Sequence, residues 1–411
     1  MRLQLIISFA SAALVACGFA HAAEKLVVTV HNDVSIARPA ETIVVPFSDV
    51  KQRLPNVLFD QVVVRDAKGK LIPSQVTAMR HIHKGPQVYD DLVFQHDFAA
   101  GEKNAKFTVE AAASPAPPLP SKVYARVVPE RFDDFAWEND KVAHRAYGPG
   151  LELPSATKDQ MTSSGIDLWA KKVPYLIVDR WYHKGHDGLH TDTGEGLDFY
   201  EVGTTRGVGG TGIWDGKKLS TSKNWRTWAV YANGPVRAIF DLGYEAWDAG
   251  NGVQVKETKR FVVDAGRYFD EVSCRFDFTP APGSDGAITV AIGLTEHPSQ
   301  GEVAAMRDER GRWIGLWEKY RAPEDGELGT GVIVAPEADF AGFAHTQPLP
   351  NGRSESLVLV KVKPGESVRY LTGGGWNKTR EFANAEQWKS YLTAWSARLA
   401  SPVRVELSPA K

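Results

Sequence analysis

The sequence predicts a mainly β protein: a small N-terminal β-sandwich, a larger β-sandwich and one helix near the C-terminus. Short runs rich in Val, Ile, Thr and aromatic residues recur along the chain, separated by Pro, Gly, Asn and Asp. The Pro-rich stretch SPAPPLPS, between Ala113 and Lys122, cannot continue a β ladder and favours an extended spacer. We therefore predict an N-terminal domain over 23–112, a linker over 113–122 and a large domain over 123–411.

The first residues predict export from the cytoplasm. A basic start is followed by an apolar run over 3–16 and by Ala20-His21-Ala22, which suits cleavage after Ala22 and makes 1–22 a signal peptide. Leu14-Val15-Ala16-Cys17 also resembles a lipoprotein box, in which Cys17 would be lipidated and become the first residue. The two interpretations exclude each other. Either one places the mature protein in the periplasm or at the outer membrane.

Composition limits the classes of partner. The chain has 411 residues, 43% of them hydrophobic, which is enough for one large or two smaller cores. A formal net charge of -2 provides no basic field, so nucleic acid is not an expected partner. No later apolar run can cross a membrane, which leaves lipid at Cys17 as the membrane contact. After processing, Cys274 is alone, and we interpret it as a core residue.

The individual elements follow from periodicity. The front domain contains the runs LVVTV, TIVVPF, NVLFDQVVVRD, LVFQHDF and KFTVE. In the large domain, 236–248 alternates apolar and polar residues and turns through a Gly-rich segment into 253–264, which predicts a hairpin. Further strands are predicted at 268–278, 287–294, 356–362 and 367–371. A helix is predicted over 383–399, capped by Asn384 and Gln387, with an apolar stripe of Trp388, Tyr391, Leu392, Trp395 and Leu399.

The segment 181–214 is the strongest candidate for a functional loop. It carries three His, several carboxylates and an Arg on a backbone that we expect to be too rich in Gly for a regular helix or long strand. The alternative is a solvated surface loop. The ligands His183, His186 and His190 could hold a divalent ion, but their spacing matches no established zinc motif, so no cofactor is the prediction.

Three further clusters are candidates. Trp137, Asn139 and Arg145 lie in one strand-like segment, which could equally be an exposed edge with a salt bridge. His297 follows a buried-looking strand, although a lone His is more often structural. Trp376 and Lys378 follow three glycines, where a tight turn is the alternative. Because several of the 12 Trp lie in polar segments, carbohydrate is the favoured ligand class.

Three long runs carry a family resemblance. These are WEND-x-x-A-x-R-x-YGP over 137–149, H-x-D-x-GEGLDFY-x-VG over 190–203 and GGTGIWDGK over 209–217. They resemble the secreted bacterial proteins grouped as domain-of-unknown-function family 4861. The resemblance implies a galactose-mutarotase-like β-supersandwich and a place in clusters that degrade uronic-acid polysaccharides such as pectin and ulvan. It further implies an activity that dehydrates uronate-ended oligosaccharides, so that the expected partner is an oligosaccharide substrate.

The implied elimination can be matched to residues of this chain. Removal of the C5 proton requires a cation or strong donor on the C6 carboxylate, a base, and an acid for the leaving oxygen. Arg145 and Arg206, together with Asn139, are candidates for the carboxylate contact. His190 is the candidate base, and Tyr200 is the candidate acid, with His297 in reserve. A glycoside hydrolase would instead pair Glu195 with Asp198 or Glu296, and a non-catalytic carbohydrate-binding protein is the third hypothesis.

We expect His190, Tyr200, Arg145 and Arg206 to line one cleft, with His297 contributing from a third strand. The predicted substrate contacts are Trp137, Asn139, Trp181, Asp192, Glu195, Asp198, Arg206, Trp214, Trp376 and Lys378.

Overall fold

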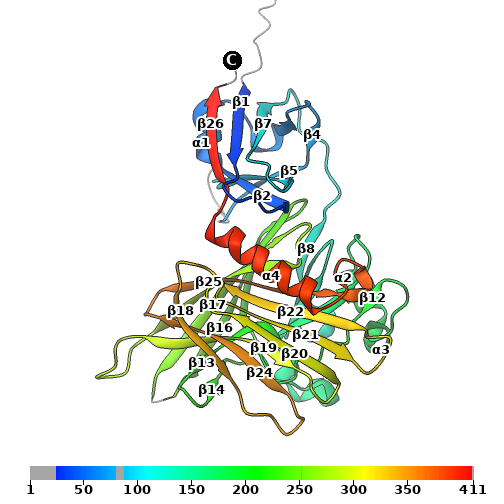
Figure 1. The fold of residues 1–411 in the computed structure, drawn as a ribbon, viewed down its shortest axis with the longest axis vertical. Coiled ribbons are helices and arrows are strands. Elements are labelled where there is room, and N and C mark those ends of the chain that lie inside the picture. Colours follow the sequence, from blue (N-terminus) through cyan, green and yellow to red (C-terminus); the bar gives the residue numbers. More distant parts are fainter. Residues whose placement is uncertain (1–24, 80–87, 251, 410–411) are drawn as a thin grey trace, which may run out of the picture.

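The computed structural model describes residues 25–79, 88–250 and 252–409, and its fold is mainly β with one long helix near the C-terminus (Figure 1). The predicted fold class is thereby confirmed. The predicted signal peptide, 1–22, lies outside the described residues. Among the helices of the described residues, none is long and apolar enough to cross a membrane.

The front lobe, drawn in blue and cyan in Figure 1 except for the red β26, contains two small sheets. One has the order β26-β1-β7-β3-β4 and the other the order β2-β6-β5. Their strands are β1 (Lys25–His31), β2 (Arg38–Pro46), β3 (Val62–Asp66), β4 (Leu71–Ile72), β5 (Ser74–Thr77), β6 (Asp91–Phe98), β7 (Asn104–Ala111) and β26 (Arg404–Pro409).

The last strand, β26, corrects the predicted assignment of the chain end to the large domain. It pairs antiparallel with β1, from Leu26 opposite Pro409 to His31 opposite Arg404. Val403, Val405 and Leu407 pack against the front-lobe core, which is separate from the main core. Both ends of the described chain therefore lie in the front lobe.

The main lobe contains three sheets. A five-stranded sheet has the order β12-β11-β10-β9-β8, a second five-stranded sheet β14-β13-β19-β24-β23, and an eight-stranded sheet β15-β16-β17-β18-β25-β22-β21-β20. Their bounds are β8 (Val123–Val128), β9 (Asp134–Asn139), β10 (Ala143–Ala146), β11 (Ile166–Lys171), β12 (Gly196–Leu197), β13 (Val208–Trp214), β14 (Leu219–Ser220), β15 (Thr227–Asn233), β16 (Arg237–Asp248), β17 (Gln254–Asp264), β18 (Phe269–Phe278), β19 (Ile288–Glu296), β20 (Gly301–Asp308), β21 (Trp313–Tyr320), β22 (Glu327–Val334), β23 (Asp339–His345), β24 (Ser354–Val362) and β25 (Ser367–Trp376).

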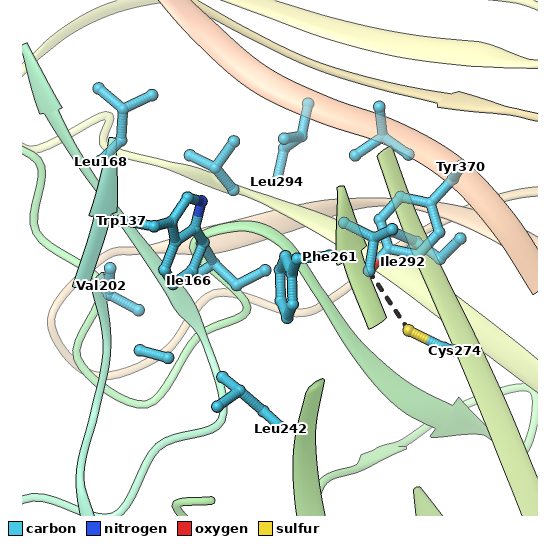
Figure 2. Packing of buried hydrophobic residues seen from close by; sticks show 14 of the residues in the cluster. Trp137, Ile166, Leu168, Val202, Leu242, Phe261, Cys274, Ile292, Leu294 and Tyr370 are labelled. Atoms are coloured by element: carbon cyan, nitrogen blue, oxygen red, sulfur yellow. Dashed lines mark hydrogen bonds between the residues drawn. The ribbon is translucent and has the colours of Figure 1, made fainter. Parts of the chain in front are cut away.

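Both five-stranded sheets pack against the eight-stranded one, and a single apolar core fills the space between them. The predicted hairpin is present as β16 and β17, whose inward residues Leu242 and Phe261 lie in this core with Trp137, Leu168 and Leu294 (Figure 2). Cys274 is buried in the same core, with its sulfur 3.7 Å from the hydroxyl of Tyr370. Its interpretation as a core residue is therefore confirmed.

The helices are α1 (Phe47–Arg53), α2 (Val178–His183), α3 (Gly185–Leu189) and α4 (Ala385–Ala400). Short 3-10 turns occur at Phe59–Gln61, Pro129–Arg131, Pro149–Glu152, Pro154–Asp159 and Asn377–Thr379.

Helix α4 confirms the prediction for the C-terminal helix and its cap. The side chain of Asn384 accepts from the Gln387 amide at 3.1 Å, and the Gln387 side chain accepts from the Ala383 amide at 2.8 Å, which satisfies one free donor of the first turn and one just before the helix. The apolar stripe packs against the outer face of the large sheet at β21 and β22. In Figure 1 the helix crosses between the two lobes, and its Arg398 pairs with Glu41 of the front lobe at 2.6 Å.

The segment 181–214 differs from the predicted loop without regular structure. It starts within α2, continues through α3 and β12, and ends in the seven-residue strand β13. The glycines of β13 reflect crowding, because a Cβ on Gly209 would lie 2.3 Å from the Thr372 hydroxyl oxygen and one on Gly210 2.4 Å from the Arg206 carbonyl oxygen. The glycine-rich run is therefore a packed strand of the main lobe.

Candidate functional site

A charged face lies beneath helices α2 and α3. Alternation along β9, β10 and β11 turns Trp137, His144 and Leu168 toward the main core and the residues between them to the other side. Apolar residues of this other side, including Ala136 and Trp169, pack against Trp181 and Leu189 of α2 and α3, which together we call the cover. The charged residues of the same covered face are Asp134, Glu138, Arg145, Asp167 and Lys171.

Arg145 is the centre of a buried ionic cluster on the covered face. Its Nε donates to Asp167 Oδ2 at 2.8 Å, and its Nη2 lies 2.5 Å from the same oxygen and 3.1 Å from Asp198 Oδ2. Its Nη1 lies 3.9 Å from Asp134 Oδ2. We call Arg145, Asp134, Asp167 and Asp198 the Arg145 cluster.

The cluster holds more carboxylates than cations, and burial controls their protonation. Burial raises the pKa of Asp134 to about 6, although Arg145 and Arg131 act against the rise. Burial, followed by the neighbouring carboxylate of Asp167, raises the pKa of Asp198 well above its usual value. Burial also raises the pKa of Asp167. The cluster therefore retains protons at a pH where exposed aspartates have lost theirs, as is common at catalytic sites.

His190 lies at the exposed edge of this cluster. Its Nδ1 is 2.6 Å from the carbonyl oxygen of Asp198, whose carboxylate binds Arg145. Because a carbonyl can only accept, Nδ1 carries the proton, and the neutral ring has its free lone pair on Nε2. Two predicted site residues, His190 and Arg145, are thus brought together through Asp198.

Tyr200 and His297 contact each other but are buried. Their ring centroids are 4.8 Å apart, and the Tyr200 hydroxyl donates to the carbonyl of Gly207 at 3.1 Å. His297 Nε2 lies 2.7 Å from the carbonyl oxygen of Glu201, and its Nδ1 is 3.1 Å from Glu318. Burial raises the pKa of Tyr200 well above its usual value. Both side chains therefore support the chain at 198–201 from within, rather than lining an open cleft with His190.

Arg206 and Asn139 lie in the interior, away from the predicted cleft. The Arg206 guanidinium donates to Ser164 Oγ at 2.8 Å and to the carbonyls of Thr204 and Thr211 at 3.0 and 3.2 Å. The Asn139 side-chain nitrogen donates to two backbone carbonyls at 2.8 Å each. Both side chains are therefore held inside the protein, where they do not face the predicted cleft or a substrate carboxylate.

The predicted aromatic and Lys contacts are also engaged in packing. Trp137, Trp181 and Trp376 are buried, and their indole nitrogens donate to Asp270, Glu195 and the Asp325 carbonyl, respectively. Trp214 is half-buried against a small apolar cluster of β19 and β24. Lys378 donates to the carbonyl of Glu324. Trp376 ends strand β25 rather than following a turn, so the expected aromatic edge of a cleft is not formed by these rings.

The buried carboxyl group of Asp270, which accepts a hydrogen bond from Trp137, should make the stability of the protein depend on pH. Burial raises the pKa of Asp270 to about 7, although the hydrogen bond from Trp137 lowers it, so the folded state retains a proton that the unfolded chain releases near pH 4. The free energy of unfolding therefore falls as the pH rises from about 4 to 7. Asp270→Asn removes this dependence, and its stability relative to wild type should rise by about 2–3 kcal/mol between pH 5 and pH 8. Urea unfolding at both pH values measures this, with the exposed Asp277→Asn as control; parallel pH profiles would refute it.

Of the remaining predicted residues, Asp192 and Glu195 lie on the loop after α3, and His183 ends α2. Asp192 pairs with Lys172 at 2.7 Å, and Glu195 pairs with Lys184 at 2.9 Å. His183 Nδ1 bonds the Asp179 carbonyl at 2.6 Å. Within the described parts of the chain, no three His, Cys, Asp or Glu side chains are grouped so that they could hold a metal ion.

Sequence reasoning missed Asp134, Asp167, Tyr147 and Arg353. Arg145 lies with its guanidinium carbon 5.3 Å from the ring centroid of Tyr147. Tyr147 is part of the run 137–149, where it could have been chosen with Arg145. Asp167 and Asp134 are charged residues next to large apolar residues within strands, and this is the signal in the sequence that could have identified them. Arg353 pairs with Glu201, which lies 152 residues earlier in the chain, and no local pattern in the sequence connects the two.

Comparisons with known proteins identify the family but no activity. A protein of Formosa agariphila named "Uncharacterized protein P7" is 32% identical over 393 residues, which cover 93% of this chain and 94% of that protein. Two Enterococcus faecalis structures are also similar: a protein in the glycosyl hydrolase family 38 (TM-score 0.48, 11% identity, 95% of this chain) and an alpha-mannosidase (TM-score 0.47, 10% identity, 93% of this chain). The chain spans about half of each structure, 48% and 46%.

The model of the family described as "Domain of unknown function (DUF4861)" matches residues 30–405. This range includes all three sequence runs and both lobes of the structure. The chain belongs to the DUF4861 family.

Proposed function

We propose that the protein is a carbohydrate-active enzyme that eliminates water or an alcohol from uronic-acid-containing oligosaccharides at the site formed by His190 and the Arg145 cluster. The substrate class comes from the family resemblance. The choice of site rests on the residues themselves. One observation carries it: Asp198 binds His190 through its carbonyl and Arg145 through its carboxylate, so one residue fixes the exposed imidazole beside the buried Arg145 cluster.

His190 is the proposed base. Because Nδ1 is bound to the Asp198 carbonyl, Nε2 carries the lone pair that is available to remove the C5 proton of a uronate. The exposure of the side chain permits contact with a substrate without movement of the core. The contact with the Asp198 carbonyl fixes the orientation of the ring, so less conformational entropy of the side chain is lost when the transition state forms.

Tyr147 and Arg353 complete the proposal. Tyr147 is the proposed acid for the leaving oxygen. Burial raises the pKa of its phenol, but Arg145, whose guanidinium carbon lies 5.3 Å from the ring, acts to lower it and would stabilise the phenolate left after proton transfer. Arg353 is the proposed contact for the C6 carboxylate. Its present partner, Glu201, has a side chain that is 55% exposed, and a substrate carboxylate could replace it. These assignments replace Tyr200 and Arg206, whose side chains are buried inside the protein.

A glycoside hydrolase is the second candidate, favoured by the contact of Asp167 and Asp198 with the same nitrogen of Arg145. The pairs considered from sequence fit less well. Glu195 accepts five hydrogen bonds, and Glu296 on β19 is bound by Ser354, Ser356 and His345.

The two reactions and simple binding are distinguished by their products. The purified protein is incubated with uronate oligosaccharides, and near-ultraviolet absorbance and reducing ends are followed together. Elimination yields a C4–C5 double bond that absorbs, whereas hydrolysis yields reducing ends without absorbance. A binding protein yields neither, and that result would overturn both catalytic candidates.

We further propose that the protein acts in the periplasm or at the outer membrane, as the N-terminal sequence predicts. In fractionated cells, the mature chain should begin at Ala23 if it is soluble, or at a lipidated Cys17 if it is membrane-bound. N-terminal sequencing and intact mass measure this. Cytoplasmic protein that retains Met1 would contradict it.

A further inference from the structure

The Glu195 carboxylate accepts five hydrogen bonds from one short stretch of chain. Oε1 accepts from the Tyr175 hydroxyl at 2.9 Å and from Nε and Nη2 of Arg180 at 3.0 and 2.7 Å. Oε2 accepts from Trp181 Nε1 at 3.1 Å and from Lys184 Nζ at 2.9 Å. All four donor residues lie in or next to α2, which forms the first part of the cover over the Arg145 cluster.

The backbone of Glu195 is fixed to the sheet below. Its carbonyl accepts from the Lys172 amide at 2.9 Å, and the next residue, Gly196, pairs with Lys171 of β11. Gly196 has φ +121°, and a Cβ there would lie 2.0 Å from the Ala170 carbonyl oxygen. A side chain at this position would force the strands apart. Glu195 thus joins a rigid sheet edge to the helical cover.

The start of the cover is held by a second carboxylate. Glu138 is fully buried, accepts from the amides of Ile177 and Val178 at 2.7–2.8 Å, and pairs with Lys171 at 2.8 Å. Glu195 differs because solvent reaches three of its four donors; the Arg180 side chain is 61% exposed, whereas Trp181 is buried. Of the two attachments, Glu195 is therefore the more exposed one.

Beneath the cover, the fit is incomplete. Within the described residues, the hydroxyl of Tyr182 and Oδ2 of Asp134 are buried and have no hydrogen-bond partner. Each such group costs about 1–3 kcal/mol, which offsets part of the apolar packing between the cover and the sheet. The attachment at Glu195 accordingly matters for keeping the segment in place.

We propose that Glu195 is a positioning residue that holds 178–189 over the Arg145 cluster and thereby keeps His190 against the Asp198 carbonyl. The catalytic consequence rests on the proposed function of His190; the structural role does not. His190 follows α3 directly. Glu195 holds the start of this segment through α2, and the Asp198 carbonyl holds its end through the His190 ring. Loss of the attachment should therefore free the imidazole without altering its chemistry.

The protonation of Glu195 agrees with this role. Burial acts to raise its pKa, but the hydrogen bonds from Lys184, Tyr175, Arg180 and Trp181 lower it to about 2. Because this value is below that of the unfolded chain, the stabilisation is present at neutral pH and is lost as the pH falls from about 4.5 toward 2.

Glu195→Gln tests the proposal in the free protein. In this variant an amide NH2 group replaces one of the two carboxylate oxygens and cannot accept hydrogen bonds. Because each oxygen of Glu195 accepts at least two, at least two of the five hydrogen bonds are lost. Amide hydrogen exchange over 178–190 should become at least ~10-fold faster while β9 and β10 are unchanged. The ¹⁵N signal of His190 should change from the Nδ1–H form to a mixture of tautomers. Asp241→Asn is the matched control, since Asp241 also accepts from an Arg and a Tyr, but on β16.

Unchanged exchange over 178–190 and an unchanged His190 signal in Glu195→Gln would overturn the proposal. If that variant does not fold, Lys184→Met, which removes one donor, should give a smaller increase confined to the same segment, and no increase there would also overturn it. These readouts need no substrate, so they stand even if uronate turnover fails. If turnover is found, Glu195→Gln should lower kcat more than it changes KM, because the base is displaced while the carboxylate contact remains.

Discussion

Replacement of His190 by Ala should abolish turnover while leaving the fold intact. Loss of a positioned general base lowers the rate by about 10²–10⁴-fold. The side chain is exposed, and its hydrogen bond is to a backbone carbonyl at the surface edge of the cluster, so the free energy of unfolding should change by about 0.5 kcal/mol or less. Initial rates on uronate oligosaccharides and urea unfolding measure the two effects.

His186→Ala is the matched control for this variant. The His186 ring lies 4.7 Å from that of His190 and is also exposed, so it shares the local environment without the contact to Asp198. It should retain most of the activity. Full activity in His190→Ala would remove His190 as the base, and equal loss in both variants would indicate a disturbed loop.

Arg145→Ala should instead destabilise the whole main lobe. The substitution leaves Asp134, Asp167 and Asp198 buried without their shared cation. Breaking a buried ion pair from one side costs about 3–5 kcal/mol, and the loss should be smaller at pH 5, where the carboxylates take up protons more readily. Denaturant unfolding at pH 5 and 8 measures both.

Arg369→Ala is the comparison for Arg145. Arg369 also contacts two carboxylates, Glu271 and Glu337, but its side chain is 35% exposed. An exposed pair contributes about 0–1 kcal/mol, so this variant should be nearly as stable as wild type. Similar losses of unfolding free energy in both variants would show that burial of the Arg145 cluster does not determine how much the cluster contributes to stability.

Local patterns were sufficient to predict most elements. Alternation predicted the β16–β17 hairpin, and the Asn384 and Gln387 cap predicted the start of α4. The pairing of β26 with β1 could not be predicted in this way, because it joins residues about as far apart in sequence as the chain allows. Nothing local in either strand specifies its partner.

The candidate site was predictable only in part. His190, Asp198 and Arg145 stand out in the sequence as polar residues of the candidate segments, and the structure joins the first and last of them through Asp198. Burial of Arg206 depends on groups such as Glu355, which lies 149 residues away and accepts from its amide at 2.6 Å. A Gly-rich run that contains an Arg looks the same in sequence whether it forms an exposed loop or a packed strand, and here the contacts with distant strands decided between them.

The most direct test of the central claim is mass analysis of defined uronate oligosaccharides after incubation with the wild-type protein and with His190→Ala. If His190 removes the C5 proton, the wild type should convert a uronate-ended oligosaccharide either to a product lighter by one water or to two fragments, one of which carries the new double bond. His190→Ala should leave the substrate unchanged. Fragments that have gained water, or unchanged substrate with the wild type, would contradict elimination at this site.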